Sequence, residues 1–211
     1  SDTTSINVRN IKIFQECGIR DVFILSHGGT LYDDSKNLNV IALMMKMMGF
    51  WVGCNYLQND VEEELAKFPI DHVDAIWYDN SWAGIKSEWT KHRWNLKLKY
   101  SAPMMYGGVA FKYCPQPKSL QEACDVAVEN MDVIVTSGNG TGEAADIEKI
   151  NTMKKIVNGR KPLAIASGIT PENINDYDCD IVMVNTGISD DFYSINESKL
   201  KRLIKVNERC V

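Results

Sequence analysis

The sequence predicts an α/β protein with the architecture of a TIM barrel, (β/α)8. Short apolar runs alternate with helical patterns along the chain, and small glycine-bearing loops follow the late runs. Such alternation is typical of βαβ units and a parallel sheet. An open doubly wound sheet would share the alternation, but the loops favour the barrel. We expect one barrel domain that covers residues 1–211.

Seven segments rich in Val, Ile and aromatic residues are expected to form the strands. They cover residues 21–25, 50–55, 74–78, 103–111, 132–136, 162–166 and 180–184. Successive segments begin roughly one βα unit apart. A complete barrel typically has about 250 residues. A chain of 211 residues is slightly short for one.

The segments between these strands have the periodicity of helices that pack on a sheet. Apolar residues recur every three or four positions at Leu120, Cys124, Ala127 and Met131, and at Ile147, Ile150, Met153 and Val157. Glycines that favour a helix end stand at Gly18, Gly49 and Gly159. Each βα unit therefore has its own expected helix and stop.

The composition excludes several classes of protein. The chain is 45% hydrophobic and 24% charged, which is typical of a globular domain and not of a disordered chain. Its net charge of -5 argues against binding to a nucleic-acid polymer, because phosphate backbones are bound mainly by Lys and Arg. No apolar run reaches the roughly 18 to 20 residues that cross a bilayer.

The six cysteines show neither a C-x-x-C pair nor a nearby His at zinc spacing. We interpret them as reduced thiols that pack in the interior, with disulfides as the alternative that their even number allows. No signal peptide opens the chain. The sequence therefore predicts a cytoplasmic protein without a metal site.

Three loops that follow the last three predicted strands are small, polar and rich in glycine. Their candidate ligand-binding residues are Ser137, Gly138, Gly140, Thr141, Gly142, Ser167, Gly168, Asn185, Thr186 and Gly187. Glycine lets the backbone approach a phosphate closely, and many barrels bind phosphate after their last two strands. Ordinary turns and helix caps are the alternative, since Thr170-Pro171-Glu172 also reads as a helix start.

Residues at the carboxyl ends of barrel strands face the active site, and three of them are candidate catalysts. Asp79 could act as a general acid or base, because burial raises the pKa of a carboxylate toward neutrality. Lys112 could neutralise a phosphate or a developing negative charge. His27 could transfer protons near neutral pH. The alternatives are a turn or cap for Asp79, a solvated strand end for Lys112 and a backbone contact for His27.

Further strand-end residues are candidates for ligand binding: Asn55, Asn59, Asp60, Asn80, Trp82 and Glu143. The polar ones near residue 55 could bind sugar hydroxyls, although Asp60 also fits a helix N-cap. Trp82 could stack on a nucleotide base, which is worth about 1–3 kcal/mol. Trp89 and Trp94 are better explained by packing.

These residues resemble the BtpA family, whose members are TIM-barrel proteins. The similarity runs from about Asn7 to Leu203, and its most specific segments are residues 52–60, 136–142, 166–173 and 184–186. The late segments are also similar to the phosphate loops of phosphoribosyl-type barrels. The resemblance implies that one strand before the first helix is missing, which leaves an open seam that another segment or a second subunit would cover.

The chain departs from the family pattern at the end of the barrel where chemistry is expected. Residues 26–29 are Ser-His-Gly-Gly where the family tends to place an acidic residue, and Lys112 is kept without its usual neighbours. Ser189 stands where the family often has a lysine.

Three classes of function remain open. The leading one is an enzyme that isomerises, epimerises or cleaves a phosphorylated sugar or nucleotide by acid–base chemistry. No G-x-G-x-x-G follows a first strand, so no cofactor is predicted. The second is a non-catalytic protein that sequesters a nucleotide-like ligand. The third is an assembly factor for a protein complex, which family members have been linked to. The expected partners are a small phosphorylated ligand and a second copy of the chain.

Overall fold

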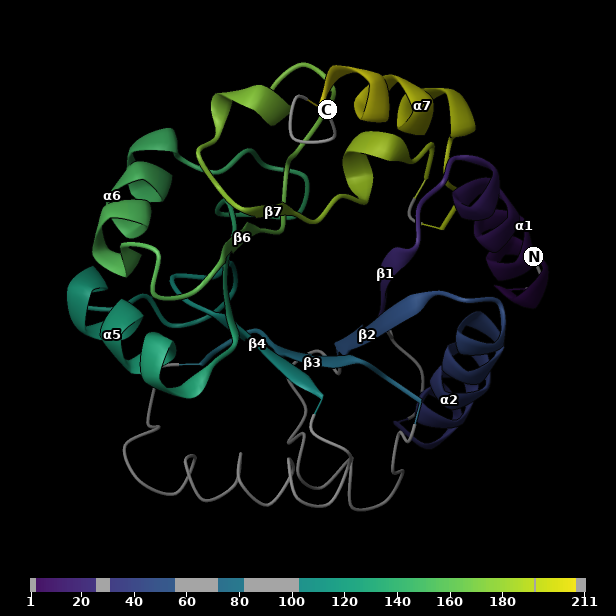
Figure 1. Cartoon of the computed structure of the whole chain (residues 1–211), viewed down its shortest axis with the longest axis horizontal. Coiled ribbons are helices and arrows are strands. Elements are labelled where there is room, and N and C mark those ends of the chain that lie inside the picture. The colour runs from purple at the N-terminus through teal and green to yellow at the C-terminus, as the bar shows by residue number, and fades with distance from the viewer. Residues whose placement is uncertain (1–2, 26–30, 56–71, 82–102, 192, 208–211) are drawn as a thin grey trace.

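A parallel β-sheet forms the centre of the molecule (Figure 1). The computed structural model describes residues 3–25, 31–55, 72–81, 103–191 and 193–207. Within them seven strands follow one another in the sheet in chain order, and each pairs in parallel with the next. The sheet curls, and the helices lie outside it. The predicted α/β barrel-like fold is confirmed.

All seven predicted strands are present, most of them shorter than expected. They are β1 Asp21–Leu25, β2 Trp51–Asn55, β3 Ala75–Tyr78, β4 Met104–Gly108, β5 Val133–Thr136, β6 Leu163–Ile165 and β7 Ile181–Val182. The expected strand over residues 103–111 was wrong at its carboxyl end. The chain leaves the extended conformation after Gly108, because Ala110 has a φ of 48°, in the left-handed region.

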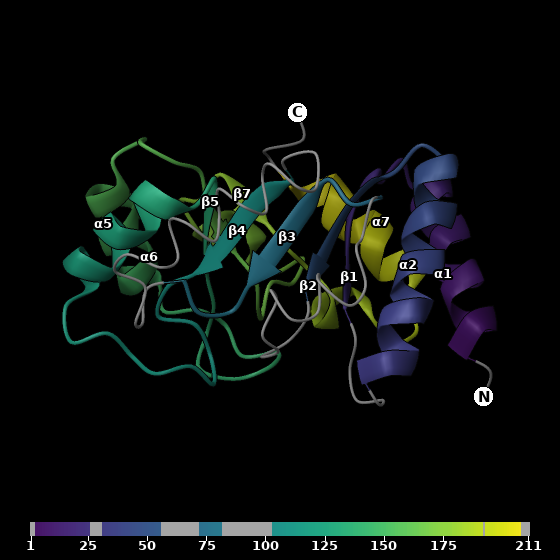
Figure 2. The same ribbon diagram turned by 90° about the horizontal axis from the view of Figure 1, so that it is seen from below.

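The helices that cover the sheet in the described part of the chain fall on its outer side. They are α1 Thr3–Glu16, α2 Leu31–Met47, α5 Leu120–Asn130, α6 Ile147–Val157 and α7 Glu197–Val206, with the 3-10 turns η1 Ile174–Asp176 and η2 Thr186–Ile188. Seen from below, α1, α2 and α7 flank one end of the sheet, and α5 and α6 flank the other (Figure 2).

Local sequence signals set the helix ends. The side chains of Ser119, Asp146 and Asn196 accept a backbone N–H from the first turns of α5, α6 and α7. Gly18 and Gly49 follow α1 and α2 with positive φ, as the sequence predicted. Gly159 follows α6 in the same way with a φ of 70°, as the sequence predicted, and the cap residue Asn158 before it is also left-handed, with a φ of 48°.

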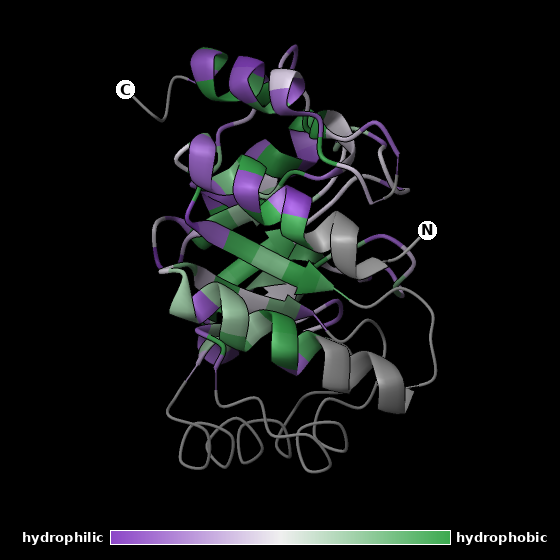
Figure 3. Cartoon of the chain, turned by 90° about the vertical axis from the view of Figure 1, so that its right-hand side faces the viewer, coloured by the Kyte–Doolittle hydropathy of each residue, from purple (hydrophilic) through white to green (hydrophobic). Residues whose placement is uncertain are grey.

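Strand side chains alternate between two apolar faces. The inner face holds an aromatic group in which Phe23 packs edge-on against Trp77 and Tyr106, and Trp77 packs edge-on against Phe111. The outer face packs on the helices through residues such as Ile134 and Ile150. Hydrophobic residues accordingly concentrate in the strands and on the inner sides of the helices (Figure 3).

Three aspartates repeat one arrangement at the amino end of the sheet. Each immediately precedes a strand, accepts a backbone N–H from the preceding strand through its carboxylate, and pairs with a lysine. The pairs are Asp74 with Lys46, Asp132 with Lys161, and Asp180 with Lys154. Each of these three strands begins directly after its aspartate, one residue later than the sequence suggested.

Strands β1 and β7 are the two edges of the sheet among the described residues, so the barrel does not close by strand pairing there. The helical layer bridges this seam. The side chain of Asn10 in α1 donates to Tyr193 O at 2.7 Å and accepts from the N–H of Ile195 at 3.1 Å. Ile13 of α1 also joins the apolar cluster that contains Leu200 and Leu203 of α7.

Candidate functional site

Two of the three predicted catalytic residues lie together at the carboxyl ends of β2 to β4. We call Asn55, Asp79 and Lys112 the early-strand cluster. The amide of Asn55 donates to Asp79 Oδ1 at 2.8 Å, and Asn55 is buried, with 1% of its surface exposed. Lys112 interacts electrostatically with the Asp79 carboxylate. This arrangement places an oriented carboxylate near a half-buried ammonium.

Burial lowers the pKa of Lys112 below that of a free lysine, and the nearby Tyr113 and Asp79 only partly offset this effect. Its ammonium lies 5.8 Å from the centre of the Phe111 ring. Its backbone N–H donates to Ser137 Oγ at 2.8 Å. Lys112 therefore links the early-strand cluster to the loop after β5.

The loop that carries Lys112 adopts an unfavourable backbone conformation at two positions. Ala110 and Tyr113 have φ values of 48° and 61°, where residues with a Cβ are uncommon. Such strain costs of the order of 1–3 kcal/mol per residue and clusters at functional sites. The Tyr113 hydroxyl donates to Thr141 Oγ1 at 3.3 Å and accepts the N–H of Thr141 at 3.0 Å, which fastens this loop to the next.

The three predicted phosphate loops come together at the carboxyl ends of β5 to β7. We call residues 137–143, 167–169 and 185–189 the late-strand loops. A Cβ on Gly168, whose φ is 62°, would lie 2.2 Å from Glu143 O, and a Cβ on Gly187 would lie 1.9 Å from Ile169 O. Glycine at both positions is therefore required for the loops to pack against one another.

The predicted serine hydroxyls hold the late-strand loops in place. Ser137 Oγ donates to Gly138 O at 2.8 Å, and Ser167 Oγ donates to Gly140 O at 2.9 Å. Because these protons are directed at carbonyls, the two hydroxyls are poorly placed to donate to a ligand.

The backbone amides of these loops, and not the serine hydroxyls, are the donors that remain available for a ligand. Among the described residues, the N–H groups of Gly138, Gly140, Gly168 and Gly187 donate no hydrogen bond. Gly138, Gly140 and Gly168 are buried, and a buried backbone N–H normally has an acceptor. Several such donors, contributed by three neighbouring loops, form a local environment suited to an anion.

Lys149 in α6 contacts two loops of the candidate site, and the sequence did not predict it. Its ammonium donates to Ala110 O at 3.3 Å and also to Ser137 O, and burial lowers the pKa of Lys149. In a trans peptide the N–H points opposite to the preceding C=O. Holding Ser137 O toward α6 therefore turns the Gly138 N–H away from the helix. The sequence did offer a signal, because Lys149 stands among the apolar residues Ile147, Ile150 and Met153 of a predicted helix.

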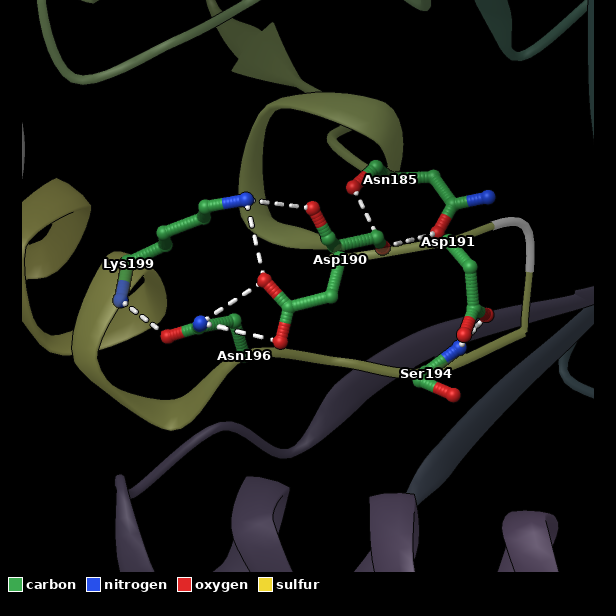
Figure 4. Close-up of polar contacts among 7 residues, drawn as sticks. Asn185, Asp190, Asp191, Ser194, Asn196 and Lys199 are labelled. Carbon is green, nitrogen blue, oxygen red and sulfur yellow. Dashed lines mark hydrogen bonds and ion pairs between the residues drawn. The ribbon is translucent and has the colours of Figure 1, made fainter.

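The loop after β7 has its own polar network (Figure 4). Lys199 of α7 donates to Ser189 O at 2.7 Å and pairs with Asp190 at 3.1 Å, and Asn196 also donates to Asp190. The amide oxygen of Asn185 accepts from Ser189 Oγ at 3.1 Å. Asn185 thus supports the loop, while Thr186 and Gly187 lie closer to the loops after β5 and β6.

Glu143 lies at the end of the first late-strand loop. It is exposed, its backbone packs against Gly138 and Gly168, and its carboxylate lies beside Gly140. Asn80 is half-buried beside Asp79. His27, Asn59, Asp60 and Trp82 fall outside the described residues.

Other features are limited to the same described ranges. There, no group of three or more His, Cys, Asp and Glu side chains is placed to hold a metal ion. No helix of that part of the chain is long and apolar enough to cross a membrane. Cys17, Cys54, Cys114, Cys124 and Cys179 are free thiols.

Solved structures with a similar fold include phosphoribosylanthranilate isomerase from Thermotoga maritima, in a monomeric form. It is 13% identical, with a TM-score of 0.63, and the match covers 96% of this chain and 94% of that one. Thiamine phosphate pyrophosphorylase from Pyrococcus furiosus is 13% identical, with a TM-score of 0.64 and coverage of 100% and 91%. 3-Keto-L-gulonate-6-phosphate decarboxylase from Vibrio cholerae is 11% identical, with a TM-score of 0.62 and coverage of 97% and 94%.

These similarities show the TIM-barrel-like fold. The names of all three proteins refer to phosphorylated compounds. No protein-family model matches the chain, and no curated protein matches it. Membership of the BtpA family therefore stays a prediction.

Proposed function

We propose that this protein is an enzyme that acts on a phosphorylated sugar or nucleotide-like molecule. The phosphate lies on the late-strand loops, and the remainder of the molecule reaches the early-strand cluster. One observation carries the proposal: three loops that pack against one another contain backbone N–H groups that lack an acceptor among the described residues. The names of the three structural neighbours, all of which include a phosphorylated compound, agree with this ligand class.

The early-strand cluster supports acid–base chemistry in this proposal. Asp79 takes a proton from the substrate or returns one, while the Asn55 amide, at 2.8 Å, fixes the orientation of the carboxylate. The Lys112 ammonium stabilises negative charge that develops on a substrate oxygen, and its partial burial strengthens that effect. Isomerisation, epimerisation and cleavage at an anomeric carbon all fit these two groups without a cofactor.

The test begins with ligand binding. Thermal unfolding is recorded with ribose 5-phosphate and AMP, and with ribose and adenosine as their dephosphorylated partners. A ligand at about 100 times its Kd adds about 2.7 kcal/mol, which corresponds to a rise in Tm of roughly 5 to 11 °C for a domain of this size. We expect the phosphorylated members alone to raise Tm and Gly168→Asp to abolish the rise.

Turnover then separates an enzyme from a binding protein. Each stabilising compound is followed by NMR for conversion, in the wild type and in Asp79→Asn. We expect Asp79→Asn to keep the rise in Tm and to lose about 100-fold or more in rate, the usual contribution of a general acid or base. The matched control Asp176→Asn, at an exposed position in η1, should retain full activity. Binding without conversion by the wild type would favour the sequestering protein, and a folded protein that binds no phosphorylated compound would refute the proposal.

A further inference from the structure

Trp77 carries a buried polar group that the proposed chemistry does not use. The residue is 6% exposed, and its indole N–H has no hydrogen-bond partner among the described residues. Buried tryptophans usually satisfy this donor, and leaving it unpaired costs stability. An unpaired donor that is held rigidly in a protein interior is therefore a candidate for contact with a ligand.

The position of Trp77 in the sheet brings it next to the early-strand cluster. It lies opposite Asn55 in the register of β2 and β3, and two residues before Asp79. In a strand, residues two apart share one face, so Trp77 and the position of Asp79 continue the same inner row. Trp77 also packs with Phe111, the residue that precedes Lys112. The indole therefore lies on the inner face of the sheet, on the amino-terminal side of Asp79, the residue to which we assign proton transfer.

Two phenyl rings fix the orientation of the indole. The centroids of Phe23 and Phe111 each lie 5.6 Å from the ring of Trp77, at interplanar angles of 83° and 90°. Edge-to-face packing against two rings restricts rotation of the indole. The direction of its N–H is therefore set before any ligand binds, as electrostatic stabilisation of a reacting group requires.

We propose that the Trp77 indole N–H donates a hydrogen bond to an oxygen of the bound molecule, and that this oxygen belongs to a carbonyl or carboxylate group. This inference rests on the proposed function, because the phosphate on the late-strand loops anchors the same molecule. An indole N–H only donates, so it selects an acceptor and disfavours an ammonium group. A carbonyl oxygen held there, beside Asp79, is activated for removal of a neighbouring proton.

Another unpaired buried group does not compete for this role. Thr136 Oγ1 also lacks a partner among the described residues. However, Val133 and Val135 of the same strand face the inner aromatic group, so Thr136 faces the opposite side of the sheet. The Asn55 amide, for its part, already donates to Asp79.

The test compares two ligands that differ only at the carbonyl group. Affinities for ribulose 5-phosphate, ribitol 5-phosphate and inorganic phosphate are measured by calorimetry with the wild type, Trp77→Phe and Trp51→Phe. Trp51 belongs to the same aromatic group and packs on Phe23, so Trp51→Phe reproduces the loss of ring size. We expect the wild type to prefer ribulose 5-phosphate to ribitol 5-phosphate by about tenfold. Trp77→Phe should lose that preference, and Trp51→Phe should keep it.

A second measurement does not depend on the stability of the variant. The indole signal of Trp77 in the 1H–15N spectrum of the wild type is assigned through its contacts with Phe23 and Phe111. It should shift with ribulose 5-phosphate and stay in place with inorganic phosphate. An unchanged ketose preference in Trp77→Phe, or an indole signal that does not shift when the ketose binds, would overturn the inference about Trp77. It would leave the proposed function intact. Failure of the wild type to bind inorganic phosphate would instead remove the phosphate site on which the proposed function depends.

Discussion

The two ends of the sheet are built in opposite ways. At the amino end, Asp74, Asp132 and Asp180 repeat one contact, in which a carboxylate accepts a strand N–H and pairs with a lysine. At the carboxyl end, the described loops share no such repeated contact. The loop after β4 is strained, and the three late-strand loops pack through glycine, the last of them also held by Lys199.

The repeated contacts at the amino end stabilise the fold, whereas the carboxyl end holds the candidate functional site. A contact that recurs from strand to strand satisfies polar groups and stabilises every unit in the same way. The carboxyl end instead retains unfavourable features: positive φ at Ala110 and Tyr113, glycine N–H groups without an acceptor among the described residues, and a half-buried ammonium at Lys149. Proteins keep such features where a ligand or a reaction requires them.

The largest effect is expected from a single methyl group at the carboxyl end. In Gly168→Ala the new Cβ would lie 2.2 Å from Glu143 O, at a φ of 62°. We expect about 3 kcal/mol of lost stability in urea unfolding, because neither backbone can yield cheaply. We also expect at least 100-fold weaker binding of inorganic phosphate by calorimetry.

Gly159→Ala is the matched control for this change. Gly159 has a φ of 70°, yet a Cβ there meets nothing within 4 Å. It should cost about 1 kcal/mol through its backbone conformation alone and leave phosphate affinity unchanged. Equal effects of the two substitutions on binding would contradict the assignment of Gly168 to the site.

A smaller effect is expected at Lys149, which holds carbonyls from two loops. Lys149→Met leaves Ala110 O and Ser137 O without this donor, so we expect a loss of about 2 kcal/mol in stability and about tenfold in phosphate affinity. Lys155→Met, at an exposed position of the same helix, should change neither quantity. Lys149→Arg should recover part of the affinity. Unchanged phosphate binding in Lys149→Met would show that the amine only supports the fold.

The smallest effect is expected at the amino end, in Asp180→Asn. Burial raises the pKa of Asp180, but the hydrogen bond from Leu163 N–H and the Lys154 ammonium outweigh it, so its pKa is lowered overall. A lowered folded-state pKa gives stability that is present above the unfolded value of about 3.9 and is lost as pH falls through the folded value.

Asp180→Asn should therefore cost 1 kcal/mol or less at pH 7, with a flatter loss of stability below about pH 4. Acid unfolding followed by circular dichroism measures this, and phosphate affinity at pH 7 should equal that of the wild type. A loss of phosphate binding would mean that the two ends of the sheet are not separate in function.

Sequence patterns predicted the strands and the helices well, because the alternation of apolar runs and helical periods is a local property. The same patterns also predicted that Asp79, Lys112 and the three glycine loops lie at one end of the sheet. The error at residues 109–111 has a physical cause. Apolar residues such as Val109 and Phe111 look like strand, and only their neighbours show that Ala110 turns out of it.

The sequence did not predict which groups of the site are free to act. Ser137 and Ser167 looked like ligand donors, yet contacts with Gly138 and Gly140, the latter 27 residues away from Ser167, occupy their protons. Lys149 reaches Ala110 across 39 residues, and no local pattern encodes that contact. Donor availability depends on tertiary contacts, whereas residue type and strand end are visible in the sequence.

Asn10 joins parts of the chain 183 and 185 residues apart, at Tyr193 and Ile195. A contact between such distant segments closes nearly the whole chain into a loop, so its entropy cost falls late in folding, after the local βα units have formed. The same contact is then expected to open first under native conditions. Hydrogen exchange at the Ile195 amide should be faster than at the strand amides of β4 and β5, and the seam between α1 and α7 would be the point where unfolding starts.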